Sequence, residues 1–249
     1  MGEDLASLRH KFNIDTGKES YVIALAGNPN TGKSTIFNAL TGLRQHTGNW
    51  PGKTVLQAQG EFIFKSNNYL LVDLPGTYSL FPNSPDEQVA RDFLCFAQPD
   101  ATIAVADATC LERNLNLILQ IIEITPKVIL CVNLMDEAQR KNIKIDINGL
   151  TRELGIPVIP TAARNGKGLK ELKSTLAGMV EGKINPSPRQ VNYDDDIEKA
   201  VKDIEAGFKQ NLASNLINSR WLALRILDKD RSLLEGINNY FNLDSGVYI

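Results

Sequence analysis

Short apolar runs and longer amphipathic stretches alternate along residues 21–182 of the chain. The apolar runs have the length of strands, and they predict six strands, at residues 21–26, 60–64, 69–73, 101–107, 127–133 and 158–161. Apolar side chains at helical spacing predict helices at residues 33–42, 85–97, 112–124 and 168–182. The alternation predicts the α/β class, with a mostly parallel six-stranded sheet and helices on both of its faces.

One pair of predicted strands departs from the parallel pattern. Only residues 65–68, which are rich in turn-forming side chains, separate the segments 60–64 and 69–73. A connection this short favours an antiparallel hairpin, which we expect at an edge of the sheet.

The pattern changes after residue 182. A glycine and two prolines interrupt the helical spacing, which predicts a linker at 183–192 between a domain at 21–182 and a small all-α helical domain at 193–249. The apolar residues of this second domain recur at helical spacing, at Ile197, Val201, Ile204 and Phe208 and again at Trp221, Leu224, Ile226 and Leu227. The acidic residues 194–196 are interpreted as a helix start rather than a metal site. Residues 1–20 form an N-terminal extension, either loose or a short helix.

Composition argues against several classes of protein. The chain has 27 Lys and Arg against 29 Asp and Glu, whereas a nucleic-acid-binding protein is expected to carry a basic excess. No apolar run approaches the ~18 residues that cross a bilayer as a helix, and the N-terminus lacks the apolar segment of a secretory signal. The three cysteines, Cys95, Cys110 and Cys131, show no C-x-x-C spacing, which argues against a zinc site or a disulfide framework and favours a reducing cytosol.

The segment from Gly27 to Ser34 matches the phosphate-binding pattern G-x-x-x-x-G-K-[ST]. It lies between a predicted strand and a predicted helix, where backbone N–H groups and the helix N-terminus attract phosphate. Lys33 is expected to bridge the β- and γ-phosphates, and Ser34 to ligate Mg²⁺. The nucleotide-binding residues expected here are Gly27, Asn28, Pro29, Asn30, Thr31, Gly32, Lys33, Ser34 and Thr35.

Two further segments are expected to act on Mg²⁺ and the γ-phosphate. Asp73 ends a predicted strand and begins a D-x-x-G pattern, so its carboxylate is expected to hold Mg²⁺ through water while the N–H of Gly76 meets the γ-phosphate. Thr54 is placed to add a hydroxyl to Mg²⁺ only when a γ-phosphate is present. The alternative is that Thr54 is an ordinary loop threonine.

The base is expected to be guanine. Asp136 can accept two hydrogen bonds from the N1–H and the exocyclic amino group of guanine, a donor pair that adenine lacks; its alternative role is a helix cap. Backbone N–H groups after the last predicted strand are placed to meet the guanine O6. The base-binding residues expected are Asn133, Leu134, Met135, Asp136, Thr161, Ala162 and Ala163.

The order of these motifs, each at a strand end, resembles the Ras-like P-loop GTPases over residues 21–182. More narrowly, four segments resemble the cytosolic G domain of the FeoB ferrous iron transporter family, and a fifth resembles the helical domain of that family. The G-domain segments are 27–30, 49–52, 73–80 and 133–138, and the helical one is 220–228.

The resemblance implies a GTP-binding and GTP-hydrolysing domain with a GDI-like helical domain. Its GTP and GDP states would regulate Fe²⁺ uptake by a membrane-embedded transporter domain that is absent from this chain. The resemblance also implies a cytoplasmic location, a parent protein in the bacterial inner membrane, and scope for a homo-oligomer formed through the G domain. Iron specificity comes from the resemblance alone, because the sequence shows no Fe²⁺ ligand cluster.

Catalysis is expected to depend on Lys33, Thr54, Gly76 and Asn30. Thr77 stands where Ras-like enzymes have a glutamine that orients the attacking water, so slow intrinsic turnover is expected. The resemblance implies that Asn30 ligates a K⁺ in the place of an arginine finger; the alternative is that Asn30 is only a turn residue.

Some features depart from the family pattern or leave two interpretations open. Leu134 replaces the lysine of the common N-K-x-D, which predicts weak nucleotide holding, and Lys53 stands where an apolar residue is common. Residues 1–20 are longer than the usual lead-in. Trp50 is either a hydrophobic residue of a switch or a packing anchor, and His46 is expected to be solvated.

Two other functions remain open at this point. One is a stand-alone ribosome- or RNA-associated GTPase, which residues 183–249 disfavour because they show no basic surplus. The other is a nucleotide-responsive switch with negligible hydrolysis, which Thr77 would allow.

Overall fold

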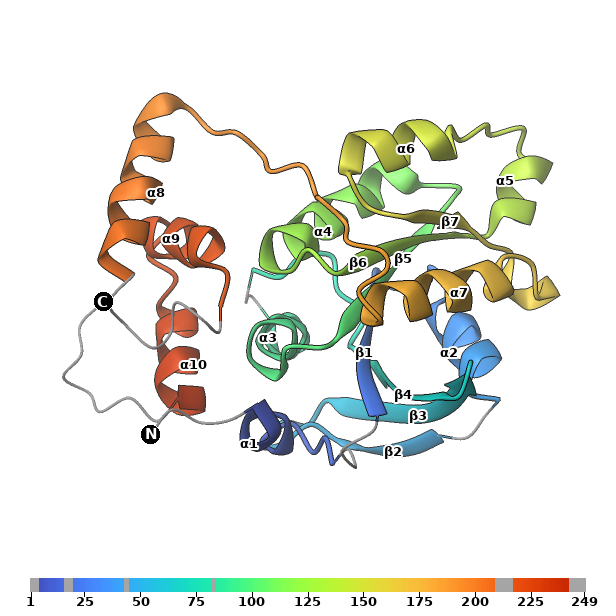
Figure 1. Ribbon diagram of the computed structural model, residues 1–249, viewed down its shortest axis with the longest axis horizontal. Helices are drawn as coiled ribbons and strands as arrows, with labels where there is room; N and C mark the ends of the chain where they lie inside the picture. The colour runs from blue at the N-terminus through green and yellow to red at the C-terminus, as the bar shows by residue number, and fades with distance from the viewer. Residues whose placement is uncertain (1–4, 16–19, 43–44, 82–83, 209–216, 242–249) are drawn as a thin grey trace.

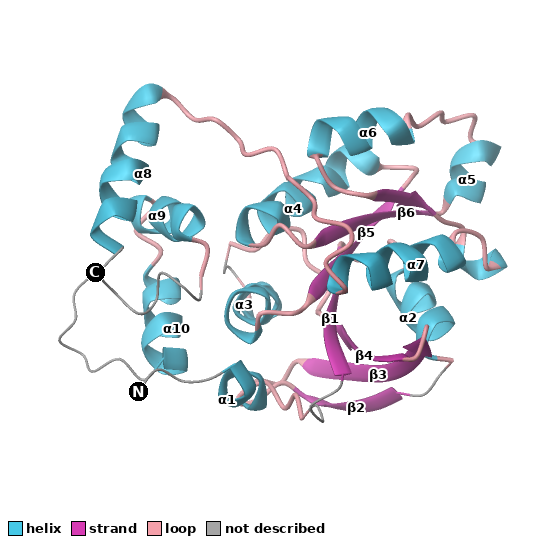
Figure 2. Cartoon of the chain, viewed as in Figure 1, coloured by secondary structure: helices cyan, strands magenta, loops and turns pink. Residues whose placement is uncertain are grey.

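The computed structural model describes residues 5–15, 20–42, 45–81, 84–208 and 217–241. Within these ranges, helices cover both faces of a sheet, and the helices α8, α9 and α10 form a group to one side of it (Figures 1 and 2). The strands are β1 (Ser20–Gly27), β2 (Gln45–Asn49), β3 (Leu56–Phe64), β4 (Asn67–Asp73), β5 (Ala101–Asp107), β6 (Val128–Asn133) and β7 (Val158–Pro160). The α-helices are α1 (Leu5–His10), α2 (Lys33–Thr41), α3 (Pro85–Asp92), α4 (Leu111–Ile124), α5 (Met135–Arg140), α6 (Ile147–Leu154), α7 (Leu169–Val180), α8 (Asp195–Phe208), α9 (Ser219–Leu227) and α10 (Arg231–Phe241).

The described strands form one seven-stranded sheet in the order β2-β3-β4-β1-β5-β6-β7. β1 pairs in parallel with both β4 and β5, and parallel pairing continues through β6 to β7. β3 pairs antiparallel with β4, as the short connection between them predicted. The expected α/β class with a mostly parallel sheet is therefore confirmed.

The prediction of six strands, with the β3–β4 hairpin at the edge, was wrong in one respect. The edge strand is β2, which pairs antiparallel with β3. Its residues from His46 to Asn49 are polar or glycine and are exposed, so the strand shows no apolar alternation. Backbone pairing alone creates β2, and this contribution leaves no hydrophobic pattern in the sequence.

Alternate residues of the central strands feed two separate hydrophobic cores. In β1, Val22 and Ala24 point into one core, and Ile23 and Leu25 point into the other. The first core lies under α3 and α4, and the second lies under α2 and α7. Because both faces are covered, strands such as β5 and β6 are apolar almost throughout.

Three helical segments differ from the sequence prediction. The helix expected at 85–97 consists of α3 followed by a fully buried π-helical turn, η1 (Phe93–Ala97). The helices α5 and α6 were not predicted, because each is short and buries only one residue, Ala138 and Leu154 respectively. So few buried positions do not establish a helical period.

The group α8–α10 shares its core with the sheet. Trp221, Leu222, Leu233 and Ile237 belong to the same buried cluster as Phe93. Between α7 and α8, where every residue is described, no helix or strand forms, and Ser187 N–H donates to the carbonyl of Gly155. The acidic residues 194–196 stand at the start of α8, where they suit the helix dipole.

A buried arginine joins the sheet domain to α10. Arg91 in α3 is fully buried, and its guanidinium contacts the Asp92 carboxylate at 2.7 Å. The same guanidinium donates to Ser232 Oγ at 2.7 Å and lies 3.4 Å from the Asp230 carboxylate, both at the start of α10. Burial raises the pKa of Asp92, although Arg91 opposes this. The positive charge of Arg91 therefore balances the negative charges of two enclosed carboxylates, Asp92 and Asp230.

We predict that Arg91→Met lowers the free energy of unfolding by about 3–5 kcal/mol, because it leaves buried carboxylates without their cation. The measurement is urea denaturation of the full chain. Arg189→Met is the matched control, since Arg189 pairs with Glu153 at 2.8 Å on the surface. The control is expected to change stability by less than about 0.5 kcal/mol. Equal losses in the two variants would contradict the prediction.

Candidate functional site

The segment from Gly27 to Ser34 forms a tight loop between β1 and α2. Asn30 and Gly32 have left-handed backbone conformations, with φ of 66° and 80°. A Cβ on Gly32 would come within 2.3 Å of the Asn133 amide nitrogen, so glycine is required there. No side chain caps the start of α2, which leaves its first N–H groups for another partner. This is the geometry of an anion-binding loop.

Lys33 lies at the centre of the expected phosphate site. Its ammonium group is 2.5 Å from the Asp73 carboxylate and 2.6 Å from the carbonyl of Leu74. Burial raises the pKa of the Asp73 carboxyl above its ordinary value, although the charge and hydrogen bond of Lys33 oppose this. The D-x-x-G loop lies against the phosphate loop, since a Cβ on Gly76 would be 3.4 Å from Pro29. Two motifs that are 40 residues apart therefore meet as the sequence predicted.

The structure does not bring Thr54 to the other expected Mg²⁺ ligands. Thr54 is exposed in the loop after β2, and no hydrogen bond joins its hydroxyl to Ser34 or Asp73, all three of which are described. Ser34 and Thr35 are exposed at the start of α2. Thr54 would have to move with its loop to share a cation with Ser34.

The side-chain amide of Asn133 holds the phosphate loop and the base loops together. Its nitrogen donates to the carbonyl of Thr31 at 3.0 Å. Its oxygen accepts from the hydroxyl of Thr161 and from the N–H of Ala163, both at 3.1 Å. Asn133 is 1% exposed, so these bonds form away from water.

Asp136 stands at the start of α5, after Leu134 in a left-handed conformation with φ of 63°. Its carboxylate accepts from the side chain of Asn165 at 3.1 Å and lies 3.6 Å from the Arg140 guanidinium. The N–H of Met135 donates to the carbonyl of Thr161, which fixes the segment against the loop that contains Ala162. Asn165 and Arg140 were missed in the sequence, where nothing distinguishes them from other surface polar residues.

Residues after Gly76 contact side chains that sequence analysis did not single out. Gln120 of α4 accepts from the N–H of Leu80 at 2.7 Å. The Arg113 guanidinium lies over the Tyr78 ring at 4.4 Å from its centroid, and that of Arg225 lies over the Phe81 ring at 4.5 Å. These three partners come from α4 and α9, so only the tertiary structure reveals them. Thr77, in contrast, is buried.

In this structure the side chain of Trp50 packs in the core, which is one of its two expected roles. Its side chain is 2% exposed and lies edge-on to Phe93, with 5.4 Å between ring centroids. Its indole N–H is buried without a hydrogen-bond partner. His46 is exposed, as expected. Lys53 donates to the side chain of Gln88 at 2.9 Å on the surface.

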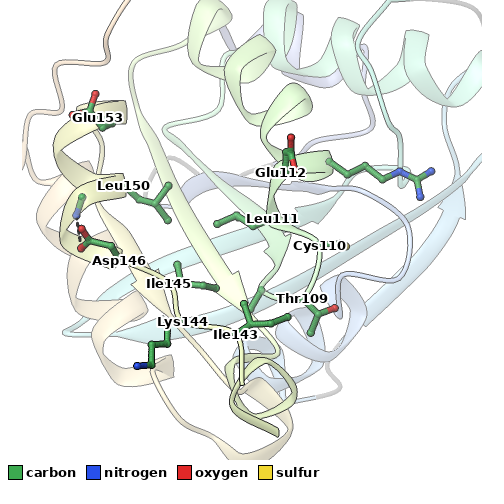
Figure 3. A pocket seen from close by; sticks show the side chains of 13 residues that line it. Thr109, Cys110, Leu111, Glu112, Ile143, Lys144, Ile145, Asp146, Leu150 and Glu153 are labelled. Atoms are coloured by element: carbon green, nitrogen blue, oxygen red, sulfur yellow. Dashed lines mark hydrogen bonds between the residues drawn. The ribbon is translucent and has the colours of Figure 1, made fainter. Parts of the chain in front are cut away.

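A cavity of about 630 Å³ lies beside the base loops rather than on the phosphate loop. Leu111, Ile145 and Leu150 line it, and Figure 3 shows these side chains from the start of α4, from the segment before α6 and from α6 itself. Cys110, which is exposed, stands at its rim. None of the expected nucleotide-binding residues lines this cavity, so it is separate from the candidate site.

The fold and these loops define a P-loop protein with a Ras-like G domain and an attached helical domain. The donors and acceptors fit a phosphate-bearing ligand, because an uncapped helix start, a lysine and a partly buried carboxylate converge at one edge of the sheet. Asn28 supports this fit, since its side-chain amide is buried and makes no hydrogen bond within the described residues.

The chain belongs to the ferrous iron transport protein B family, FeoB. The family model for ferrous iron transport protein B matches residues 21–176, and the model for the FeoB cytosolic helical domain matches residues 193–246. The cytosolic domain of the T. maritima FeoB iron transporter in a GDP form is 40% identical, with a TM-score of 0.80 over 90% of this chain and 86% of that chain. The GMPPNP form of the same domain is 39% identical, with a TM-score of 0.80 over 91% and 88%.

Longer relatives extend well beyond this chain. The Fe(2+) transporter FeoB of Escherichia coli K12 is 39% identical over 84% of this chain, which spans 27% of that protein. A Porphyromonas gingivalis Fe(2+) transport protein A/FeoB fusion protein is 37% identical over 93% of this chain and 28% of its own length. Among the helices that the structure describes, none combines the length and apolar character needed to cross a membrane.

We predict that Asn133→Ala lowers the free energy of unfolding of the nucleotide-free protein by about 2–3 kcal/mol, because it leaves buried polar groups of Thr31 and Ala163 unpaired. Denaturant titration measures the loss. Asn185→Ala is the control, because its amide makes one exposed hydrogen bond to the carbonyl of Gly182. The prediction fails if both variants are as stable as the parent chain.

Proposed function

We propose that this chain binds guanine nucleotides and hydrolyses GTP, and that its nucleotide state regulates Fe²⁺ passage through a membrane-embedded part of a longer transporter. The observation that carries the proposal is the convergence of Lys33, Asp73, Asn133 and Asp136 at the carboxyl edge of the parallel strands. Open α/β sheets bind their ligands at this edge. The T. maritima relatives described in GDP and GMPPNP forms support guanine as the base.

The phosphate end of the nucleotide would lie on the loop from Gly27 to Thr35. The uncapped N–H groups of α2 donate to phosphate oxygens, and Lys33 neutralises the β- and γ-phosphates after exchanging its bond with Asp73. Mg²⁺ would be held by Ser34 and Asp73 and, with GTP, by Thr54, and it would supply positive charge at the same oxygens. The N–H of Gly76 then meets the γ-phosphate, which joins its loop to the nucleotide state.

Hydrolysis would be slow without a further positive charge. Thr77 is buried and short, so it does not orient an attacking water as a glutamine would. Asn30 is exposed at the turn of the phosphate loop and has a left-handed backbone, so its side chain is open to solvent. A K⁺ held by Asn30 would supply the charge that an arginine finger supplies elsewhere.

Regulation would operate through the contacts between the loop after Gly76 and the helical domain. Phe81 lies under the guanidinium of Arg225 in α9, and the Arg225 guanidinium is also paired with Asp228 at 3.0 Å. A movement of Gly76 would therefore pass along a short stretch of chain to Phe81, which contacts α9. The G domain at 21–182, the linker at 183–192 and the helical domain at 193–249 stay predictions, based on the glycine and two prolines that interrupt the helical spacing.

The surroundings of the parent protein follow from the family. We place this chain on the cytoplasmic side of the bacterial inner membrane, with the membrane-embedded transporter domain as its partner. A homo-oligomer formed through the G domain stays a prediction. Fe²⁺ is the proposed cargo of the membrane part. Among the described residues, no group of three His, Cys, Asp or Glu could hold a metal ion.

We predict that GTP turnover is at least about tenfold faster in KCl than in NaCl at equal ionic strength, because K⁺ at Asn30 stabilises charge in the transition state. Asn30→Ala should abolish the difference and should change GDP affinity far less than turnover, which separates chemistry from binding. Phosphate release under saturating GTP and Mg²⁺ measures both rates. Equal turnover of the parent chain in the two salts would remove K⁺ from the proposal.

We predict that Asp136→Asn changes the base preference from guanine to xanthine, because an amide at this position offers a donor to the xanthine O2. Competition between GDP and XDP for the variant measures the exchange, and a loss of GDP affinity of about 100-fold is expected. Glu137→Gln is the control on the same helix, since Glu137 pairs with Arg140 on the surface. An Asp136→Asn variant with the GDP affinity of the parent chain would refute the base assignment.

A further inference from the structure

Several of the described residues 5–15 of the N-terminal extension are buried, although they precede the matched range of the family model, which begins at residue 21. Leu8, Phe12 and Ile14 are 0%, 3% and 2% exposed, respectively. Apolar side chains this deeply enclosed contribute to packing rather than serving as a loose lead-in. In Figure 1, α1 lies between α10 and the edge formed by β2 and β3.

Arg9 anchors the extension to the sheet domain. Its guanidinium donates to the carbonyls of Ala97 at 3.1 Å and Gln98 at 2.8 Å, and it contacts the Asp100 carboxylate at 3.1 Å. Asp100 also accepts from the N–H of Val22 in β1 at 2.7 Å. The extension is thus held at the start of β5 by a mostly buried, charge-assisted network.

Two backbone carbonyls that follow Arg9 accept hydrogen bonds from side chains of β3. Gln57, a buried residue of β3, donates to the carbonyl of Phe12 at 2.9 Å, and Gln59 donates to that of Asn13 at 3.0 Å. The Asn13 amide in turn donates to the carbonyl of Asn49, the last residue of β2, at 3.4 Å. These bonds place the extension beside the loop that carries Thr54.

Phe12 lies between that loop and the helical domain. Its ring stacks on Tyr240 of α10, with centroids 4.9 Å apart and an interplanar angle of 11°, and it lies edge-on to Trp50 at 6.4 Å. Lys11 donates to the carbonyl of Tyr240 at 2.7 Å. Among the described rings, Phe12 is the one that contacts both Trp50 and Tyr240. Phe93 contacts Trp50 and Phe12 at 5.4 and 5.5 Å, and Phe96 contacts Tyr240 at 4.5 Å.

Trp50 in turn closes the Thr54 loop. The backbone N–H of Trp50 donates to the carbonyl of Val55 at 2.9 Å, and the backbone carbonyl of Trp50 accepts from the N–H of Lys53 at 3.0 Å. These backbone bonds tie Trp50 to residues on either side of Thr54, so a displacement of the whole residue would reach both of them. The reverse also holds, because ordering Thr54 at a cation would pull on Trp50.

We propose that residues 5–14 form a bracket that couples the Thr54 loop, residues 50–55, to α10 of the helical domain, with Phe12 as the positioning residue at its centre. The coupling is mechanical and exists without nucleotide. Its use in reading the γ-phosphate rests on the proposed function, because only that function gives Thr54 a reason to move. The bracket is a connection to the helical domain that is separate from Arg91 and from the contact between Phe81 and Arg225.

The test is hydrogen–deuterium exchange of the full, nucleotide-free chain in a double-mutant cycle of Phe12→Ala and Tyr240→Ala. Phe12→Ala is expected to speed exchange about tenfold in residues 50–55 and in α10. Tyr240→Ala should also speed exchange in residues 50–55, although its ring touches none of them, and this effect should vanish when Phe12 is already alanine.

Controls keep the result interpretable. Leu5→Ala, at an exposed position of the same extension, should leave both regions unchanged. Phe12→Leu keeps an apolar contact and should give a smaller effect than Phe12→Ala in both regions. Exchange in β5 and β6 should match the parent chain in every variant. A uniform increase that includes β5 and β6, or a Tyr240→Ala effect on residues 50–55 that persists without Phe12, would overturn the bracket.

A second arm adds GMPPNP with Mg²⁺. The parent chain should change in residues 27–34, in residues 50–55 and in α10, and Phe12→Ala should keep the first two changes and lose the third. An α10 response that is equal in both proteins would overturn the coupling. If residues 27–34 of the parent chain do not respond at all, the proposed nucleotide function fails instead, and the nucleotide-free cycle still decides the bracket.

Discussion

The hydrogen bonds of the Asn133 side chain are the interaction on which the candidate site depends most directly. One buried amide joins the phosphate loop at Thr31 to the loop that begins at Thr161. The parallel pairing of β1, β5 and β6 brings these loops to one edge of the sheet, but pairing alone leaves each loop free to adopt other conformations. The amide removes that freedom, since a loop that rotates away leaves buried polar groups unpaired. Gly32 is part of the same constraint, because any side chain there would occupy the position of the amide nitrogen.

The charges at the site are arranged so that a bound ligand would replace the ion pair between Lys33 and Asp73. Lys33 and Asp73 hold each other in a partly buried position, and burial still raises the pKa of Asp73. A carboxyl with a raised pKa has a destabilised charged form, so a divalent cation bound beside it would relieve that cost while phosphate took over Lys33. The same two residues therefore hold the loops together without ligand, and they would supply opposite charges to the proposed ligand, which carries both phosphate and Mg²⁺.

The helical part depends on the sheet domain for much of its core. Trp221, Leu233 and Ile237 share a buried cluster with Phe93, and Arg91 extends into α10. Shared packing of this kind resists independent movement of the two parts. Movement at the nucleotide would consequently reach the helices as small changes at particular contacts. The aromatic rings of Phe12 and Phe81 lie at two such contacts, one beside each loop that is expected to respond to the γ-phosphate.

The sequence by itself determined the chemistry and the framework of this protein. Buried parallel strands appear as continuous apolar runs, and the loops that follow them carry the residue types that phosphate and guanine require, so β1, β4, β5 and β6 and their motifs were predictable. The edge strand β2 was not predictable, because its polar residues gain only backbone pairing. The same holds for Asn165 beside Asp136 and Gln120 beside Leu80, which look like ordinary surface residues until the fold places them.

The tertiary structure also decided the proposed role of residues 5–14. Phe12, Trp50 and Tyr240 lie far apart along the chain, and an interaction among three distant segments leaves no periodic signal in any one of them.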